Sequence, residues 1–335
     1  MERLTESDYK ALAEICPGGV FRDVDLSLIS RWRIGGRADL ILQPSSGSQV
    51  AALRGWFHER GMHHVVIGMT SNLLFADEGL HVPCIQIGQR MAQMSVRGTE
   101  VTAQAGVWVP GFARRVMQAG LTGAEHTCGI PGTLGGLVCM NGGSQRKGIG
   151  SNVLKVHSVD AMGREIQRSR EDCGFAYRNS VYQSNGEVIT AASLRFTPGE
   201  RSAIRREMLQ ILADRRCKFP RKEPNCGSVF KSNPAMYAEI GPPGAVIERL
   251  GLKGLRVGGA MISLHHANFI VNTNSATAVD VINIISIIHD SVLKATGYRL
   301  DAEAIFIAPN GLLIPVDRTT HSGLQSHSVK EQVFP

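Results

Sequence analysis

Residues 218–231, KFPRKEPNCGSVFK, combine a hydroxyl, a thiol and several cations in one proline-containing loop. Pro220 and Pro224 restrict the backbone there, so the Ser228 hydroxyl can be held in one orientation. A serine nucleophile of the hydrolase type would favour GxSxG, which is absent. Cys226 is a candidate reactive thiol, but the sequence shows no histidine partner for it, which favours the alternative of a small packing residue.

Two glycine-containing loops follow predicted strands and suit the close approach of a ligand. The first, Gly68-Met-Thr-Ser-Asn72, comes directly after an apolar run, and the second, residues 129–136, has the sequence GIPGTLGG. Glycine removes the Cβ atom, and successive N–H groups can converge on an anion. Each loop alone is more typical of a plain turn, but together they favour a dinucleotide ligand. The phosphate motifs GxGxxG and GxxxxGK[ST] are absent, which disfavours Rossmann and P-loop folds.

Cysteine and histidine spacing predicts no metal site. The seven cysteines are odd in number, widely spaced and without CxxC, which argues against a disulfide framework and a zinc ribbon. His63-His64 and His265-His266 are adjacent pairs, and HExxH is absent. Because the cysteines form no disulfide framework, a reducing, cytoplasmic location is expected.

Hydrophobic periodicity predicts the elements that position these loops. Helices are expected over residues 46–61, 109–120, 198–217, 244–250 and 275–297, the last with Ser275 as its N-cap and Gly297 as its stop. Strands are expected at 65–67, 100–106, 186–196, 268–272 and, as the last strand of the chain, 304–308. Residues 129–150 are predicted to form neither helix nor strand, because six glycines among the first fifteen would cost too much backbone entropy.

Length and composition limit the class of protein. The 335 residues are 43% hydrophobic and 19% charged, which predicts a folded chain of two or three domains. No apolar run reaches about 18 residues and no secretory signal is evident, so no membrane insertion is expected. The net charge of +7 favours an anionic partner. Residues 201–223 concentrate this charge, either as an anion-binding surface or as a solvated helix and linker.

Eight motifs occur in a characteristic order: Arg33-Ile-Gly-Gly-Arg-Ala-Asp39, Ser71-Asn-Leu-Leu74, Ala105-Gly106, the GIPGTLGG loop, Tyr177-Arg-Asn-Ser180, Cys226-Gly-Ser-Val-Phe-Lys231, Gly251-Leu-Lys-Gly-Leu-Arg-Val-Gly-Gly-Ala260 and His266-Ala-Asn-Phe-Ile-Val-Asn272. From about residue 25 to 310 this succession resembles the UDP-N-acetylenolpyruvoylglucosamine reductases, also called UDP-N-acetylmuramate dehydrogenases. The spacing is similar to the short-loop (type II-like) form of that family.

The resemblance implies an α+β protein with an FAD-binding fold of the vanillyl-alcohol-oxidase (PCMH) type. Two FAD-binding subdomains are expected at 20–82 and 83–205, an α+β substrate-binding domain at 206–312, and a flexible tail at 313–335. In such enzymes NADPH reduces the bound FAD, and the flavin then delivers hydride to UDP-N-acetylglucosamine enolpyruvate. The product is UDP-N-acetylmuramate, a peptidoglycan precursor. A monomer that binds a UDP-sugar and no nucleic acid is expected.

The resemblance also implies roles for individual residues. Ser228 corresponds to the serine that protonates the substrate, Arg178 to the arginine near the substrate carboxylate, and Glu303 to the catalytic glutamate. FAD contacts are implied for Gly68, Thr70, Ser71, Asn72, Leu73, Gly129, Ile130, Pro131, Gly132, Thr133, Gly135, Gly136, Asn141 and Val188. Substrate contacts are implied for Tyr177, Lys218, Lys231 and Asn268.

The sequence departs from the family pattern at several places. The usual Gly-Gly-Gly-Ser-Asn is Gly68-Met-Thr-Ser-Asn72, and the usual Asn-Ala-Gly-Ala-Tyr-Gly is Asn141-Gly-Gly-Ser-Gln-Arg146. Arg31-Trp32 and Ser232 also replace common family residues. One alternative is therefore a paralogue acting on a different nucleotide-linked enolpyruvyl or lactyl sugar. Another is a nucleic-acid-binding protein using residues 201–222, although no RNP, helix-turn-helix or finger signature is present.

Overall fold

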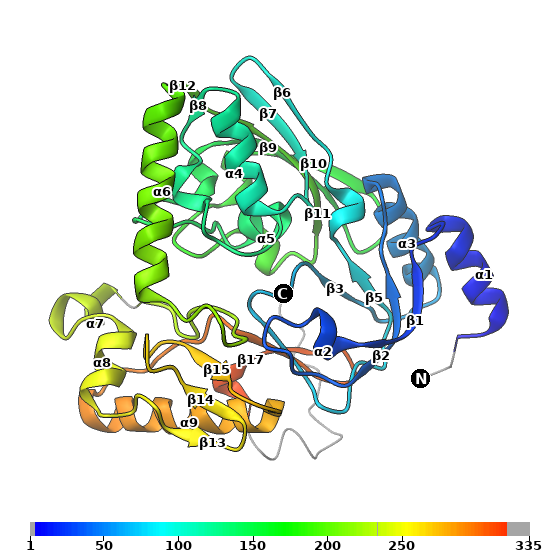
Figure 1. Cartoon of the computed structure of the whole chain (residues 1–335). Helices are drawn as coiled ribbons and strands as arrows, with labels where there is room; N and C mark the ends of the chain where they lie inside the picture. Colours follow the sequence, from blue (N-terminus) through cyan, green and yellow to red (C-terminus); the bar gives the residue numbers. More distant parts are fainter. Residues whose placement is uncertain (1–3, 233, 320–335) are drawn as a thin grey trace. The chain divides into compact units, whose positions relative to one another are not determined.

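The computed structural model describes residues 4–232 and 234–319, which form two compact units made from separate stretches of the chain (Figure 1). Unit 1 comprises Met1–Arg22, Leu40–Met69 and Val82–Arg215, and unit 2 comprises Asp23–Asp39, Thr70–His81 and Arg216–Pro335. Each unit has its own buried apolar cluster. The mixture of helices and sheets confirms the predicted α+β class.

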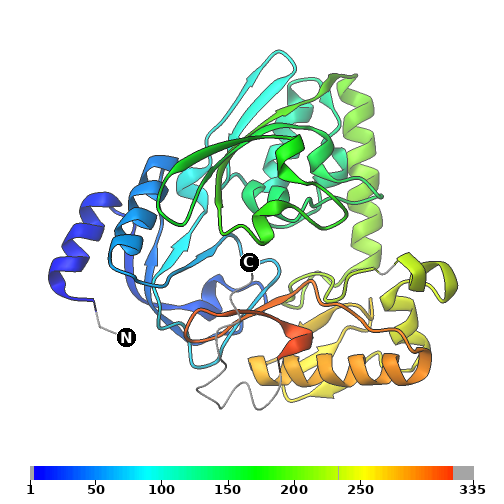
Figure 2. The same ribbon diagram turned by 180° about the vertical axis from the view of Figure 1, so that it is seen from behind.

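A five-stranded antiparallel sheet organises unit 1 (Figure 2). Its order is β10 (Glu165–Ser169), β9 (Val153–Val159), β11 (Val188–Arg195), β7 (Glu100–Gln104) and β6 (Met94–Arg97). In the register, Ala192 of β11 lies opposite Ala103 of β7 and Val156 of β9, and all three are buried. Helices α3 (Gly47–Glu59) and α5 (Leu134–Cys139) pack against this sheet, and α4 (Val109–Gln118) contacts α5.

A four-stranded sheet with the order β1 (Val20–Asp25), β2 (Arg37–Leu42), β5 (Cys84–Gln86) and β3 (Val65–Ile67) lies mainly in unit 1. Strand β5 is parallel to both β2 and β3. The remaining elements of this part of the chain are α1 (Glu6–Ile15), the short pair β8 (Leu121–Thr122) and β12 (Thr197–Pro198), α6 (Arg201–Lys218), and 3-10 helices at Gln89–Met91, Glu125–Thr127, Ile149–Ser151, Glu171–Cys173 and Val181–Gln183.

Unit 2 contains two three-stranded sheets. In one, β16 (Ile305–Ile307) pairs in parallel with β4 (Leu73–Phe75) and antiparallel with β17 (Leu313–Pro315). The other is antiparallel and consists of β13 (Arg256–Val257), β14 (Ala260–Ile262) and β15 (Ile270–Asn272), with α9 (Ala278–Thr296) along it (Figure 1). The remaining elements are α2 (Leu26–Ile29), α7 (Pro234–Glu239), α8 (Pro243–Arg249) and a 3-10 helix at Val316–Arg318.

Three local expectations are wrong. Helix α9 is capped by Thr277, not Ser275, because Thr277 and Asp280 form a reciprocal capping box. The glycine-rich segment does contain a helix, α5, whose two glycines lie in its first turn. Strand β17 follows β16, so residues 313–315 belong to a sheet and the expected flexible tail does not begin at 313. Residues 320–335 of that tail lie outside the described residues.

Among residues 4–232 and 234–319, no helix combines the length and apolar character needed to span a membrane. The division into three domains at 82 and 205 stays a prediction. The two compact units each collect residues from both sides of those boundaries.

Candidate active site

Gly68 allows the two glycine loops to approach each other closely. It follows β3, and a Cβ atom at this position would lie 2.8 Å from the Thr133 hydroxyl oxygen, closer than side chains pack. A side chain at this position would therefore force the Thr133 side chain to shift. The neighbouring Met69 side chain, a departure from the family pattern, is 39% exposed. Gly68 and Thr133, one residue from each of the two loops predicted to contact one cofactor, thus lie together in unit 1.

The Thr70 side chain binds main-chain atoms of its own unit. Its hydroxyl donates to the Ile29 carbonyl oxygen at 2.9 Å and accepts the Arg31 N–H at 3.2 Å, and its backbone is left-handed with φ +53°. The side chain is only 2% exposed. A contact between Thr70 and a cofactor would therefore use the backbone. The next three residues are half-buried: Ser71, Asn72 and Leu73.

The second half of the 129–136 loop is used for internal hydrogen bonds. The N–H groups of Leu134 and Gly135 each donate at 2.8 Å to carbonyl oxygens that follow β7. A Cβ atom on Gly135 would lie 2.9 Å from the Ala105 Cβ. The Gly136 N–H donates at 3.3 Å to the hydroxyl of Thr133, the N-cap of α5. The expectation that this loop offers free N–H groups is therefore wrong for its second half.

The first half of that loop offers N–H groups to a ligand. Within the described ranges, no acceptor takes the N–H of Gly132 or Thr133, and Gly132 has φ +127°. Gly129 packs against α6, since a Cβ atom there would lie 2.5 Å from Arg215 Cδ. Burial lowers the pKa of the Arg215 guanidinium. Sequence reasoning placed Arg215 only in a basic stretch and did not connect it with this loop. The two residues between these glycines are half-buried: Ile130 and Pro131.

Asn141 joins two chain segments through its amide group. Its Nδ2 donates to the Ala176 carbonyl oxygen at 2.8 Å, and its Oδ1 accepts the Gly150 N–H at 2.9 Å. Like Thr70, Asn141 has a left-handed backbone, with φ +40°. These contacts give it a role in holding the segment of residues 174–186, which carries Tyr177 and Arg178.

Arg178 is half-buried and donates through Nη2 to the Gly143 carbonyl oxygen at 3.0 Å. Its guanidinium carbon lies 5.4 Å from the ring centre of Tyr177, whose side chain is 61% exposed. Val188, the first residue of β11, is 8% exposed and pairs with Val159 of β9. The arginine proposed for the carboxylate therefore lies on a loop bound to the glycine-rich segment 139–150.

Ser228 and Glu303 lie on neighbouring segments of unit 2. The Glu303 N–H donates to the carbonyl oxygen of Val229, the residue after Ser228, at 2.7 Å. Both Ser228 and Glu303 are half-buried. Asn268 supports this arrangement, because its amide binds the N–H and carbonyl of Phe230 at 3.0 and 2.9 Å. The structure thus brings together two of the three residues expected to be catalytic.

The other polar groups of the 218–231 loop differ in their surroundings. Burial, followed by the negative charge of Glu303, raises the pKa of Cys226 well above its usual value, which argues against the reactive-thiol alternative. Lys231 is half-buried, and its N–H donates to the Asp301 carbonyl oxygen at 2.8 Å. Lys218 is exposed at the end of α6.

Comparison with known proteins gives a consistent set of names. One family model, described as FAD binding domain, matches residues 38–168, and another, described as UDP-N-acetylenolpyruvoylglucosamine reductase, C-terminal domain, matches residues 219–307. UDP-N-acetylenolpyruvoylglucosamine reductase 1 of Corynebacterium glutamicum is 41% identical over 313 residues, covering 93% of this chain and 90% of that protein. The Heliobacterium modesticaldum reductase is 37% identical over 286 residues, 85% of this chain and 90% of its own length. The crystal structure of the Thermus caldophilus reductase matches with a TM-score of 0.73 and 28% identity, covering 85% of this chain and 98% of that one.

Proposed function

Because this chain belongs to the UDP-N-acetylenolpyruvoylglucosamine reductase family, we propose that it uses NADPH to reduce UDP-N-acetylglucosamine enolpyruvate to UDP-N-acetylmuramate. The names of the relatives favour this reaction over a paralogous substrate or nucleic-acid binding. The observation that carries the proposal is the hydrogen bond from the Glu303 N–H to the Val229 carbonyl oxygen at 2.7 Å. It supports a shared role for Ser228 and Glu303 in one reaction.

The glycine loops fit the phosphates of FAD. Two backbone N–H groups, those of Gly132 and Thr133, have no acceptor in the described part of the chain, and a side chain at Gly68 would obstruct the space beside Thr133. Unpaired N–H groups in a glycine turn suit an anion such as pyrophosphate. When bound, the flavin would accept hydride from NADPH and pass it to the substrate. In our proposal Met69 and Thr70 replace family glycines without closing this region, because Thr70 turns its hydroxyl toward Ile29.

Arg178 is proposed to stabilise negative charge on the substrate carboxylate. Hydride addition to the enolpyruvyl double bond increases electron density on that group. A fixed guanidinium lowers the energy of the transition state more than that of the bound substrate, because the charge it faces grows during the reaction. The Arg178 hydrogen bond to the Gly143 carbonyl supports a fixed guanidinium.

Ser228 is proposed to donate the proton that completes the reduction, and Glu303 to act beside it. A serine hydroxyl is a weak acid, so a nearby cation must support the alkoxide that develops. Lys231 is favoured over Lys218 for this role, because Lys231 is half-buried and bound through its N–H to the segment that carries Glu303. Tyr177 and Lys218 are proposed to contact the UDP-sugar at the surface. Asn268 would act indirectly, by fixing the main chain at Phe230.

The experiment is a turnover assay on the purified yellow protein. The flavin is released with acid and identified as FAD by chromatography. NADPH oxidation is then followed with UDP-N-acetylglucosamine enolpyruvate and, as a control, with UDP-N-acetylglucosamine, which lacks the double bond. We expect oxidation only with the enol ether, and a product heavier by two hydrogens. A flavin-loaded protein that oxidises no NADPH with the enol ether would contradict the proposal. We also propose that the protein is a cytoplasmic monomer. Sedimentation of the purified chain tests the oligomeric state.

A further inference from the structure

We propose that Gln183 is a positioning residue for Arg178. The amide nitrogen of Gln183 donates to the carbonyl oxygen of Arg178 and to that of Cys139, each at 3.0 Å. One exposed side chain therefore links the main chain of the proposed carboxylate-binding arginine to the end of α5. This inference rests on the proposed function, since it assigns Gln183 a part in the same reaction.

Arg178 has a backbone conformation that needs support from its surroundings. Its φ angle is +52°, in the left-handed region that residues with a Cβ atom rarely adopt. Such conformations persist where neighbouring contacts impose them. Backbone hydrogen bonds between Ala176 and Asn179, at 3.1 and 3.2 Å, close the turn around Arg178. The bond from Gln183 then fixes the peptide group that follows Arg178, and with it the direction in which the side chain leaves the loop.

Cys139 anchors the Gln183 amide to the end of helix α5. It is the last residue of α5, where helix carbonyl groups lack intrahelical partners. Its carbonyl oxygen accepts both the Gln183 amide and the Ser180 hydroxyl, the latter at 2.6 Å. Helix α5 begins directly after Thr133, in the loop proposed to hold the FAD phosphates. The same short helix therefore connects the proposed cofactor loop with the proposed substrate arginine.

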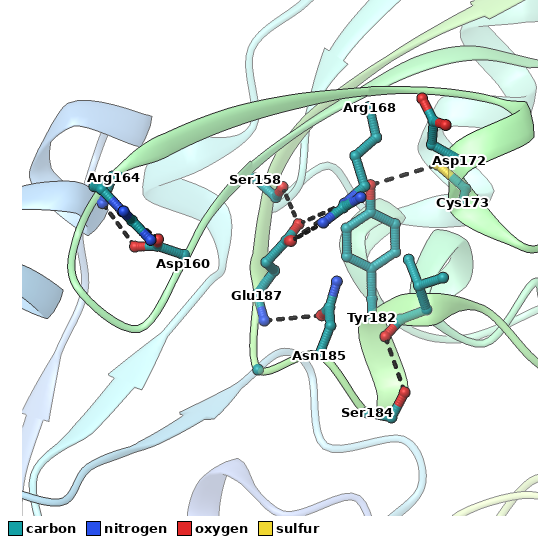
Figure 3. A network of polar contacts seen from close by, with 12 residues as sticks. Ser158, Asp160, Arg164, Arg168, Asp172, Cys173, Tyr182, Ser184, Asn185 and Glu187 are labelled. Atoms are coloured by element: carbon teal, nitrogen blue, oxygen red, sulfur yellow. Dashed lines mark hydrogen bonds and ion pairs between the residues drawn. The ribbon is translucent and has the colours of Figure 1, made fainter. Parts of the chain in front are cut away.

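The two ends of the 174–186 segment are held independently of Gln183. Figure 3 shows Glu187 between Ser158 and Arg168: the Ser158 hydroxyl donates to Glu187 Oε2 at 2.7 Å, and Arg168 Nε lies 3.1 Å from the same oxygen. At the other end, the Cys173 N–H donates to the Arg170 carbonyl oxygen at 3.2 Å, and Cys173 Sγ donates to the Ser169 carbonyl oxygen at 3.1 Å. Because these contacts fix the ends of the segment, loss of the Gln183 amide should loosen the turn at Arg178 without unfolding the unit.

The test is a double-mutant cycle with Gln183→Met and Arg178→Ala in the full chain. Methionine keeps the length of the side chain and removes its two donated hydrogen bonds. We expect Gln183→Met to lower kcat/KM for the enol ether about 10-fold, with flavin content and Tm unchanged. In the Arg178→Ala background the same substitution should have almost no further effect. The matched control is Ser184→Ala, which removes an exposed hydroxyl that donates to the Val181 carbonyl oxygen, and it should leave kcat/KM unchanged.

The outcomes separate this inference from the proposed function. If Arg178→Ala alone leaves reduction of the enol ether intact, the role proposed for Arg178 is wrong. Two results would overturn the positioning role of Gln183 while Arg178 keeps its role, provided that Arg178→Ala itself lowers kcat/KM. One is that Gln183→Met has no effect on kcat/KM. The other is that Gln183→Met lowers kcat/KM by the same factor in wild type and in Arg178→Ala. A large fall in Tm on Gln183→Met would also overturn it, because the residue would then be stabilising the fold.

Discussion

Glu303 and Asp301 are two carboxylates of one short segment with different environments. Glu303 is half-buried, and its N–H is bound to the Val229 carbonyl oxygen beside Ser228. Its charge contributes to the raised pKa of the buried Cys226 thiol. Asp301 is exposed, and its carbonyl oxygen accepts the Lys231 N–H. The two residues therefore allow a comparison in which charge is removed at nearly the same place in the chain.

Glu303→Gln should lower kcat for the enol ether by about 100-fold, the lower end of what general acid–base groups contribute. Asp301→Asn should change kcat less than about 2-fold, because its side chain is exposed and its hydrogen bond uses the main chain. Steady-state kinetics with matched protein and flavin concentrations provide the comparison. Equal losses in the two variants would mean that general charge, not the position of Glu303, matters.

At the level of residues, the segments that form the candidate site were easier to predict from the sequence than the role of each side chain. The side chains of Thr70, Asn141 and Asn268 all bind main-chain groups of the protein. A hydroxyl or an amide can satisfy a backbone group or a ligand with equal chemistry, so residue type alone cannot separate the two roles. Gln183 was not predicted, because no motif marks an exposed glutamine.

The two adjacent glycines of helix α5 differ in how much space surrounds them. A Cβ atom on Gly135 would lie 2.9 Å from Ala105 Cβ, whereas one on Gly136 would lie 3.5 Å from the Thr133 hydroxyl oxygen, an ordinary contact. Gly135 is buried and Gly136 exposed. The first glycine is therefore required for packing against the turn after β7, and the second is not.

Gly135→Ala should lower the free energy of unfolding by about 1–3 kcal/mol, the usual cost of overpacking a tight contact. Gly136→Ala should leave it unchanged or raise it by up to about 1 kcal/mol, because alanine favours the helix. Urea denaturation followed by circular dichroism measures both. A Gly136→Ala variant as unstable as Gly135→Ala would contradict this account of the helix.

Among the elements, regular periodicity was predictive and glycine content was misleading. The strand at 65–67 and the helices beginning after Ser46 and near residue 200 were predicted close to their observed bounds. Helix α5 was missed because the entropy cost of its glycines is offset by packing and by the Thr133 cap, which a local pattern does not reveal. The cap of α9 was misplaced because serine and threonine are both favoured N-cap residues, and only Thr277 has Asp280 three residues later.

At the scale of the whole molecule, each unit is assembled from distant stretches of sequence. Trp32, fully buried in unit 2, donates its indole N–H to the Ile270 carbonyl oxygen at 2.8 Å, across 238 positions. In the same unit, β4 pairs in parallel with β16. Local periodicity has no information about such contacts. The sequence therefore predicted the class of fold and most elements, but not the composition of the two units.

Buried histidines make the stability of unit 1 depend on pH. Burial, and secondarily the charge of Lys147, lowers the pKa of His126 to about 4, and neither ring nitrogen has a hydrogen-bond partner among the described residues. In the unfolded chain the pKa is about 6.5, so protonation favours unfolding. The free energy of unfolding should therefore fall as pH decreases from about 6.5 to 4, by on the order of 1–2 kcal/mol for this residue at pH 5.

His126→Phe should reduce this pH dependence, because phenylalanine fits a buried site and cannot be protonated. The exposed His58 provides the control, and His58→Gln should keep the wild-type dependence. Urea unfolding at pH 7 and at pH 5 gives the difference for each variant. Parallel pH dependences in wild type and His126→Phe would show that other groups cause the loss of stability.

The most direct test of the proposed chemistry separates its two half-reactions under anaerobic conditions. Wild type and Ser228→Ala are each reduced with one equivalent of NADPH, UDP-N-acetylglucosamine enolpyruvate is added, and flavin absorbance is followed. We predict equal rates of reduction by NADPH, rapid reoxidation of wild type with a product carrying two extra hydrogens, and reoxidation of Ser228→Ala slowed by about 100-fold or more. Wild-type flavin that stays reduced would contradict the proposed substrate, and equal losses in both half-reactions of Ser228→Ala would contradict its role as proton donor.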